Sequence, residues 1–128
     1  MHECDEAPPP LLLEGIAQFN RGEYFEQHET LELLWRAEPR EVRHLYQGIL
    51  QIGVAFHHLR RRNYHGTLSM LRRGTDYLTT FSPRCQGVDV ERLLIDAATA
   101  LRAVEQLGPD RLADFDWQLV PRVRLRSR

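Results

Sequence analysis

Apolar residues recur three and four positions apart along most of the chain, which is the spacing of one face of an α-helix. This pattern predicts five helices, and they cover residues 11–20, 23–37, 40–62, 64–81 and 90–107. No segment alternates apolar and polar residues over a convincing strand length. The sequence therefore predicts an all-α fold, a compact array of about five helices.

Residues that start or stop helices stand at the ends of these segments. Gly22 tolerates the left-handed conformation that closes a helix, and Pro10 suits a first helical turn because its missing N–H is not needed there. Asn63 and Asp89 each precede a predicted helix and offer a side-chain oxygen to its free N–H groups. The breaks between the five segments thus have physical causes.

The third predicted helix is apolar on nearly every side, which is typical of a central, buried helix. One stripe on it is small or polar instead, and consists of Gly48, Gln51, Ala55 and His58. The two small residues allow a neighbouring helix to come close. We therefore expect Gln51 and His58 to face that neighbour.

A chain of 128 residues fits one domain with one core. Residues 1–10 are polar, end in three prolines and predict a flexible N-terminal tail, whereas residues 11–121 form the single helical domain. Residues 115–120 are expected to dock on the body as an irregular segment, with Trp117 in the core. The arginine-rich residues 122–128 predict a loose, basic C-terminal tail.

Composition narrows the class of protein. With 42% hydrophobic and 27% charged residues the chain is typical of a globular domain. No apolar run approaches the roughly 20 residues of a membrane span, and the first residues lack the order of a secretory signal. Two cysteines, Cys4 and Cys85, are too few for a disulfide framework, so we expect both to be reduced and the protein to be cytoplasmic.

Charge is unevenly distributed along the chain. Residues 1–41 hold ten acidic residues and three arginines, a net charge of −7, whereas residues 42–128 hold eight and fourteen, a net charge of +6. The two parts are expected to attract each other, within the fold or between copies. Together with the apolar third helix, this asymmetry predicts a homodimer with two-fold symmetry.

Candidate chemistry concentrates in residues 19–35. Tyr24, His28, Leu31 and Trp35 form a stripe at helical spacing, which predicts that His28 occupies a core position beside Glu32, four residues on. Buried polar groups need partners. The sequence therefore predicts a buried polar cluster between the second and third helices, drawn from Glu26, His28, Glu29, Glu32, Gln51 and His58.

Two interpretations of this cluster stay open. The favoured one is a structural hydrogen-bond network in which the cluster residues satisfy one another, with no cofactor. The alternative is a divalent metal held by His28, Glu32 and His58. No second histidine follows at the spacing of a zinc-protease helix, and Glu41 and His44 give only one of the two Glu-x-x-His motifs of a di-iron bundle.

The motif residues resemble a known family. Phe19-Asn20, Gly22, Phe25-Glu26, His28-Glu29, Glu32 and Trp35, followed by Gly48-Ile-Leu-Gln51, Ala55, His58, Asn63 and Gly66, are similar to the bacterial and archaeal Domain of Unknown Function 309. The resemblance covers roughly residues 12–80 and implies an all-helical fold but no activity. Gln27 and Thr67 stand where the family pattern implies small residues such as alanine.

Three functions follow as hypotheses. The first is a non-catalytic domain that binds a protein or a small ligand, and the second is a metal-dependent, hydrolase-like enzyme that uses His28, Glu32 and His58. The third is a binder of anionic ligands or nucleic acid through the arginines at 60–62 and 72–73. The near-neutral total charge disfavours nucleic acid.

Overall fold

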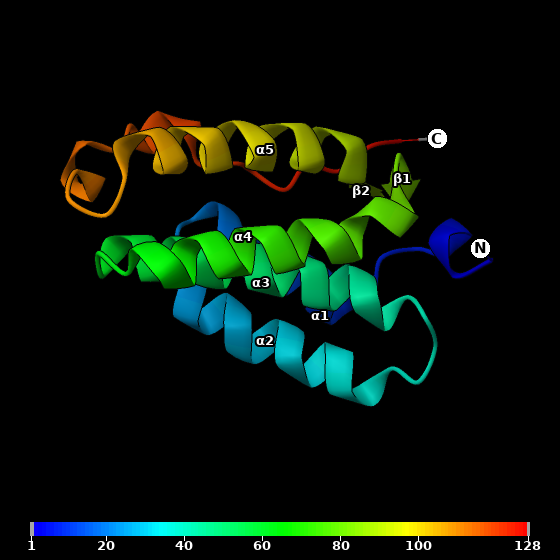
Figure 1. Ribbon diagram of the computed structural model, residues 1–128. Helices are drawn as coiled ribbons and strands as arrows, with labels where there is room; N and C mark the ends of the chain where they lie inside the picture. Colours follow the sequence, from blue (N-terminus) through cyan, green and yellow to red (C-terminus); the bar gives the residue numbers. More distant parts are fainter. Residues whose placement is uncertain (1, 128) are drawn as a thin grey trace.

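Residues 2–127, which the computed structural model describes, form five α-helices, as the sequence predicts (Figure 1). They are α1 (Pro10–Asn20), α2 (Tyr24–Ala37), α3 (Arg43–Arg60), α4 (Tyr64–Leu78) and α5 (Val90–Leu107). Two strands of two residues each, β1 (Arg84–Cys85) and β2 (Val88–Asp89), form an antiparallel hairpin. The all-α class is therefore confirmed.

The predicted helix boundaries hold within three residues. Asn63 caps α4 by accepting a hydrogen bond from the Gly66 amide at 2.9 Å, and Asp89 caps α5 in the same way. The third helix is shorter than predicted, because Arg62 adopts a left-handed φ of 59° that an α-helix cannot continue through. The fourth ends at Leu78 and continues as a 3-10 turn, Thr79–Phe81.

The third helix is the centre of the molecule, as expected. In Figure 1, α2 lies on one side of α3 and α4 on the other, and α5 lies across α4 on the side away from α2. Ile49, Ile52 and Phe56 on α3 are fully buried. The rings of Tyr24 and Phe115 flank Phe56 at centroid distances of 6.0 and 6.4 Å. Elements far apart in sequence thus cover the apolar core of the helix.

Two glycines bring α3 and α4 into close contact. A Cβ atom built on Gly74 would lie 2.8 Å from the carbonyl oxygen of Gly48, and one built on Gly48 would lie 3.0 Å from the carbonyl oxygen of Gly74. Side chains at these positions would push the two backbones apart. The expectation that Gly48 admits a neighbouring helix is therefore confirmed, and that neighbour is α4.

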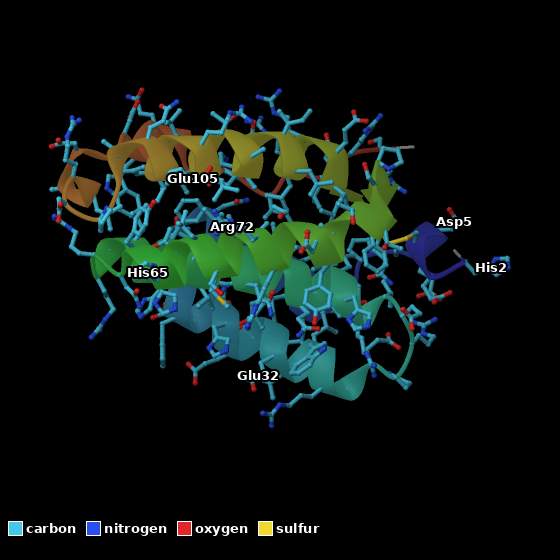
Figure 2. The ribbon with its side chains drawn as sticks, viewed as in Figure 1. His2, Asp5, Glu32, His65, Arg72 and Glu105 are labelled. Carbon is cyan, nitrogen blue, oxygen red and sulfur yellow. A yellow bond between two sulfur atoms is a disulfide. The ribbon has the colours of Figure 1, made fainter. Side chains whose placement is uncertain are left out.

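The N-terminal segment is fastened to the hairpin by a disulfide between Cys4 and Cys85 (Figure 2). The prediction that both cysteines are reduced is therefore wrong. The two residues lie 81 positions apart, and sequence spacing alone carries no information about such a pairing. The amide of Gln86 also donates to the Cys4 carbonyl at 2.8 Å, and Glu6 pairs with Arg40 at 2.8 Å.

The C-terminal segment lies against the body. Phe115 is buried, so the predicted docking of this region is confirmed, but Trp117 is 43% exposed and its predicted place in the core is wrong. Trp117 begins a 3-10 turn that lies over the surface. Farther on, the Val123 amide donates to the Asn20 side chain at 2.8 Å, and the Arg126 amide donates to the Gly87 carbonyl at 2.7 Å. The division into two tails and one domain stays a prediction.

Candidate functional site

The predicted cluster residues on α2 lie at its outer surface. The side chain of His28 is 41% exposed, and its Nε2 lies 3.5 Å from a carboxylate oxygen of Glu32. Glu32 also pairs with Arg36 at 2.7 Å and points away from the other helices (Figure 2). Glu26 and Glu29 are exposed. The prediction that His28 occupies a core position is therefore wrong.

The buried stripe of α2 is rotated relative to the predicted one. Its buried residues are Tyr24, Gln27, Thr30 and Leu31. Gln27 is fully buried and donates from Nε2 to the carbonyl of Leu50 on α3 at 3.1 Å. A buried polar contact between the second and third helices thus exists, but it is made by Gln27, one of the two positions that depart from the family pattern.

The predicted cluster residues on α3 face α4, as the small and polar stripe implied. His58 lies beside Asn63, with 3.4 Å between the ring Nδ1 and the amide nitrogen. Burial lowers the pKa of His58, and the neighbouring His57 and Arg61 act in the same direction. Gln51 lies farther along α3, where it lines a hollow shared with α4.

The structure therefore does not gather the candidate metal ligands. Within residues 2–127, no three His, Cys, Asp or Glu side chains form a group that could hold a metal ion. His28 and Glu32 lie together on the solvent-exposed side of α2, whereas His58 lies near the end of α3 beside Asn63, which caps α4. The metal-dependent mechanism has no assembled ligand set among the described residues.

The arginines proposed for anion binding also separate. Arg60 donates to the carbonyl of Gly22 at 2.6 Å, and Arg72 pairs with Glu105 of α5 at 2.9 Å. Figure 2 shows Arg72 and Glu105 directed toward each other between the two helices. Arg73 lines the same hollow as Gln51. The two arginine groups therefore do not form one basic face.

The hollow between α3 and α4 is the best candidate site. It has a volume of about 530 Å³ and is lined by Gln47, Gln51, Arg73, Asp76 and Tyr77. The spacing i, i+4 brings the two glutamines to one face of α3, and the same spacing brings Arg73 and Tyr77 to one face of α4. We call this site the α3–α4 groove.

Two glutamine amides line the α3–α4 groove. The Oε1 atom of Gln51 is buried and has no hydrogen-bond partner in the described structure. Gln47 accepts at Oε1 from the Nδ1 of His44 at 3.3 Å, and that contact does not use its NH₂ group. Each glutamine therefore brings to the lining an amide whose NH₂ group can donate to a ligand.

Two opposite charges complete the α3–α4 groove. Among residues 2–127, neither Arg73 nor Asp76 has a side-chain ion pair, although neighbouring Arg72 does. The ring of Tyr77 stacks on His44 with a centroid distance of 5.2 Å and an interplanar angle of 11°. The groove thus joins three sources of N–H donors with one carboxylate and a rigid aromatic wall.

Sequence reasoning singled out two residues of this groove, Gln51 for the polar cluster and Arg73 for anion binding, and missed the other three. Gln51 drew notice because it interrupts a stripe of small residues. Gln47, Asp76 and Tyr77 sit at ordinary helix-surface positions and carry no signal without the α3–α4 pairing. The glycines Gly48 and Gly74 were the available signal, because two close-packed helices bring their flanking residues together.

The comparisons with known proteins support the resemblance. Residues 12–70 match the model of a domain of unknown function, DUF309. The uncharacterized protein YpuF of Bacillus subtilis (strain 168) is 34% identical over 65 residues, which span 49% of this chain and 37% of that protein. None of the helices in the described residues has the length and apolarity that a membrane crossing needs. The segment from α1 to the middle of α4 is thus similar to DUF309, a family without an assigned activity.

Proposed function

We propose that this chain is a non-catalytic binding domain whose α3–α4 groove holds a small zwitterion of the amino-acid class. The carboxylate of such a ligand would accept from Arg73 and from the amides of Gln47 and Gln51. Its ammonium group would pair with Asp76. The observation that carries the proposal is the presence of an unpaired arginine and an unpaired aspartate around one hollow.

The lining explains why binding rather than catalysis is proposed. Its five described residues comprise two amides, one arginine, one aspartate and one tyrosine. These are groups that recognise and orient a polar ligand. Nucleophilic catalysis instead needs a nucleophile paired with a base, and no hydrogen bond joins the side chains of Tyr77 and Asp76 in the described part of the chain.

The test uses the full chain and ligands of graded chemistry. The twenty common amino acids are titrated individually by calorimetry, with acetate and methylamine as fragments that carry only one of the two charges. We expect one or more amino acids to bind at least about tenfold more tightly than either fragment, because both charges must be engaged. Equal binding of amino acids and acetate, or no binding at all, would refute the zwitterion proposal.

A homodimer is a second proposal, and it rests on charge alone. The structure removes the other reason for expecting one, because α3 is already covered within a single chain. The acidic first third and the basic remainder support an association that weakens as salt screens exposed charges. Light scattering at low and high salt tests it, and a single mass at both would exclude it.

We propose a cytoplasmic location, because the first residues lack the order of a secretory signal. We also propose that nucleic acid is not a partner, because the total charge is near neutral. The Cys4–Cys85 disulfide weighs against the cytoplasmic location, because disulfides persist mainly in oxidising compartments. Alkylation of free thiols in intact cells, followed by mass spectrometry, distinguishes the two cases. Predominantly alkylated cysteines support the cytoplasm, and predominantly bonded ones oppose it.

A further inference from the structure

A second hollow lies at the C-terminal end of α3 and shares no lining residue with the α3–α4 groove. It has a volume of about 480 Å³, and its lining residues are Leu59, Arg60, Arg62, Leu112, Ala113 and Trp117. The lining therefore combines an apolar floor, a large aromatic ring and two cations. We call it the Trp117 hollow.

The aromatic ring is held in place but left open. Trp117 packs edge-on against buried Phe115, with ring centroids 5.4 Å apart and an interplanar angle of 85°. It is nevertheless 43% exposed, which is unusual for a tryptophan in a chain with a well-covered core. A fixed aromatic surface at the edge of a hollow is suited to stacking against a flat ligand.

One cation of the hollow is fixed without a carboxylate partner. Arg60 donates to the Gly22 carbonyl, and its guanidinium lies 4.7 Å from the Tyr24 ring centroid and 5.9 Å from that of Trp117. No acidic side chain in the described part of the chain pairs with it. Its positive charge is therefore oriented but not neutralised.

The other cation occupies a costly backbone conformation. Arg62 has a φ of 59°, a region that side chains other than glycine and asparagine rarely adopt, at a helix end where glycine is the usual residue. It is exposed and has no ion pair within residues 2–127. Of the acids next to the lining in sequence, Asp114 pairs with Arg111, and Asp116 accepts from the Gln118 amide at the start of the Trp117 turn.

We propose that the Trp117 hollow binds a small aromatic anion, a phosphate or carboxylate attached to a flat ring. The ring stacks on Trp117 over the apolar floor, and the anionic group is bound by Arg60 and Arg62. The aromatic and apolar side chains thus contact the ring of the ligand, and the two arginines contact its anionic group.

Calorimetry with the full chain and four probes tests the ligand class. Phenyl phosphate and benzoate carry both a ring and a charge, inorganic phosphate carries only the charge, and benzyl alcohol carries only the ring. We expect phenyl phosphate or benzoate to bind at least about tenfold more tightly than the last two. The better of the two aromatic anions identifies the anionic group. Equal binding of phosphate and phenyl phosphate, or no saturable binding, would overturn the proposal.

Variants locate the site. Arg62→Ala should weaken phenyl phosphate at least about fivefold, whereas Arg61→Ala, an adjacent exposed arginine outside the lining, should leave it unchanged. Arg62→Gly should also weaken the probe while raising the melting temperature, because glycine adopts this φ without strain. Trp117→Leu should weaken phenyl phosphate but not phosphate. Indistinguishable binding by the Arg61 and Arg62 variants would contradict the site.

Discussion

At the scale of single residues, Gln27 is the side chain that makes a buried polar contact between α2 and α3. Its amide lies so close to Gly53 that any Cβ atom at position 53 would collide with it. The two positions are therefore coupled. With glutamine at 27, a side chain at 53 would force the Gln27 amide to move, whereas a small residue at 27 would leave room for it.

This coupling is tested by a double-mutant cycle measured in denaturant melts. Gly53→Ala alone should lower the free energy of unfolding by about 1–3 kcal/mol, because the new methyl overpacks the interface. In a Gln27→Ala background the same change should cost much less, since the methyl then fills vacated space. Additive effects of the two substitutions would show that the residues are not coupled.

His58 is the residue whose titration should be visible in stability. Its pKa is lowered in the folded state, so the unfolded state binds its proton more readily. Above the pKa of the unfolded state, near 6.5, neutral His58 contributes fully to the free energy of unfolding. This contribution is lost as the pH falls through the lower pKa of the folded state. Stability should therefore decrease on mild acidification.

The measurement compares pH profiles of unfolding between variants. His58→Gln should reduce the loss of stability between about pH 6.5 and 5, because glutamine does not titrate. His65→Gln on the exposed start of α4 is the control. A His58→Gln profile that parallels the wild type would contradict the assignment.

At the scale of secondary-structure elements, the crossing of α3 and α4 creates the α3–α4 groove. Glycine-to-alanine changes inside helices ordinarily stabilise, by roughly 0.5–1 kcal/mol. Gly74→Ala should instead destabilise by about 1–3 kcal/mol, because its Cβ would lie 2.8 Å from the Gly48 carbonyl. Gln106→Ala, at an exposed position of α5, should change stability by less than about 0.5 kcal/mol. A stabilising Gly74→Ala would show that the helices do not meet there.

The elements were largely predictable from sequence, because helix periodicity and caps are local properties. Asn63 and Asp89 marked the starts of α4 and α5 correctly, and the apolar surface of α3 marked it as central. The rotation of α2 was not predictable in the same way. Tyr24 and Leu31 are compatible with a buried stripe through either Gln27 or His28, and packing against Gly53 selects Gln27.

The candidate site was predictable only in part, because it depends on which helices become neighbours. Gln51 was noted, but Asp76 and Tyr77 are ordinary surface residues until α4 lies against α3. The disulfide was missed for the same reason. Cys4 meets Cys85 through the path of the whole chain, which no local pattern encodes.

At the scale of the whole molecule, this disulfide ties the N-terminal segment to the hairpin next to α5. Cross-linking residues 81 positions apart restricts the unfolded chain strongly. Reduction should therefore lower the free energy of unfolding by roughly 2–4 kcal/mol. Chemical melts with and without reductant measure this, and a Cys4→Ser variant should show no response to reductant. Equal stability of oxidised and reduced wild type would contradict a constraining role.

We expect the α3–α4 groove to recognise its ligand through Arg73. The most direct test compares Arg73→Gln with Arg72→Gln by calorimetry, using whichever amino acid the wild type binds most tightly. The two arginines are adjacent, but Arg73 lines the groove and Arg72 pairs with Glu105. Arg73→Gln should weaken binding at least about tenfold, and Arg72→Gln should stay within about twofold of the wild type. Equal affinities of the two variants would show that the ligand does not bind at Arg73.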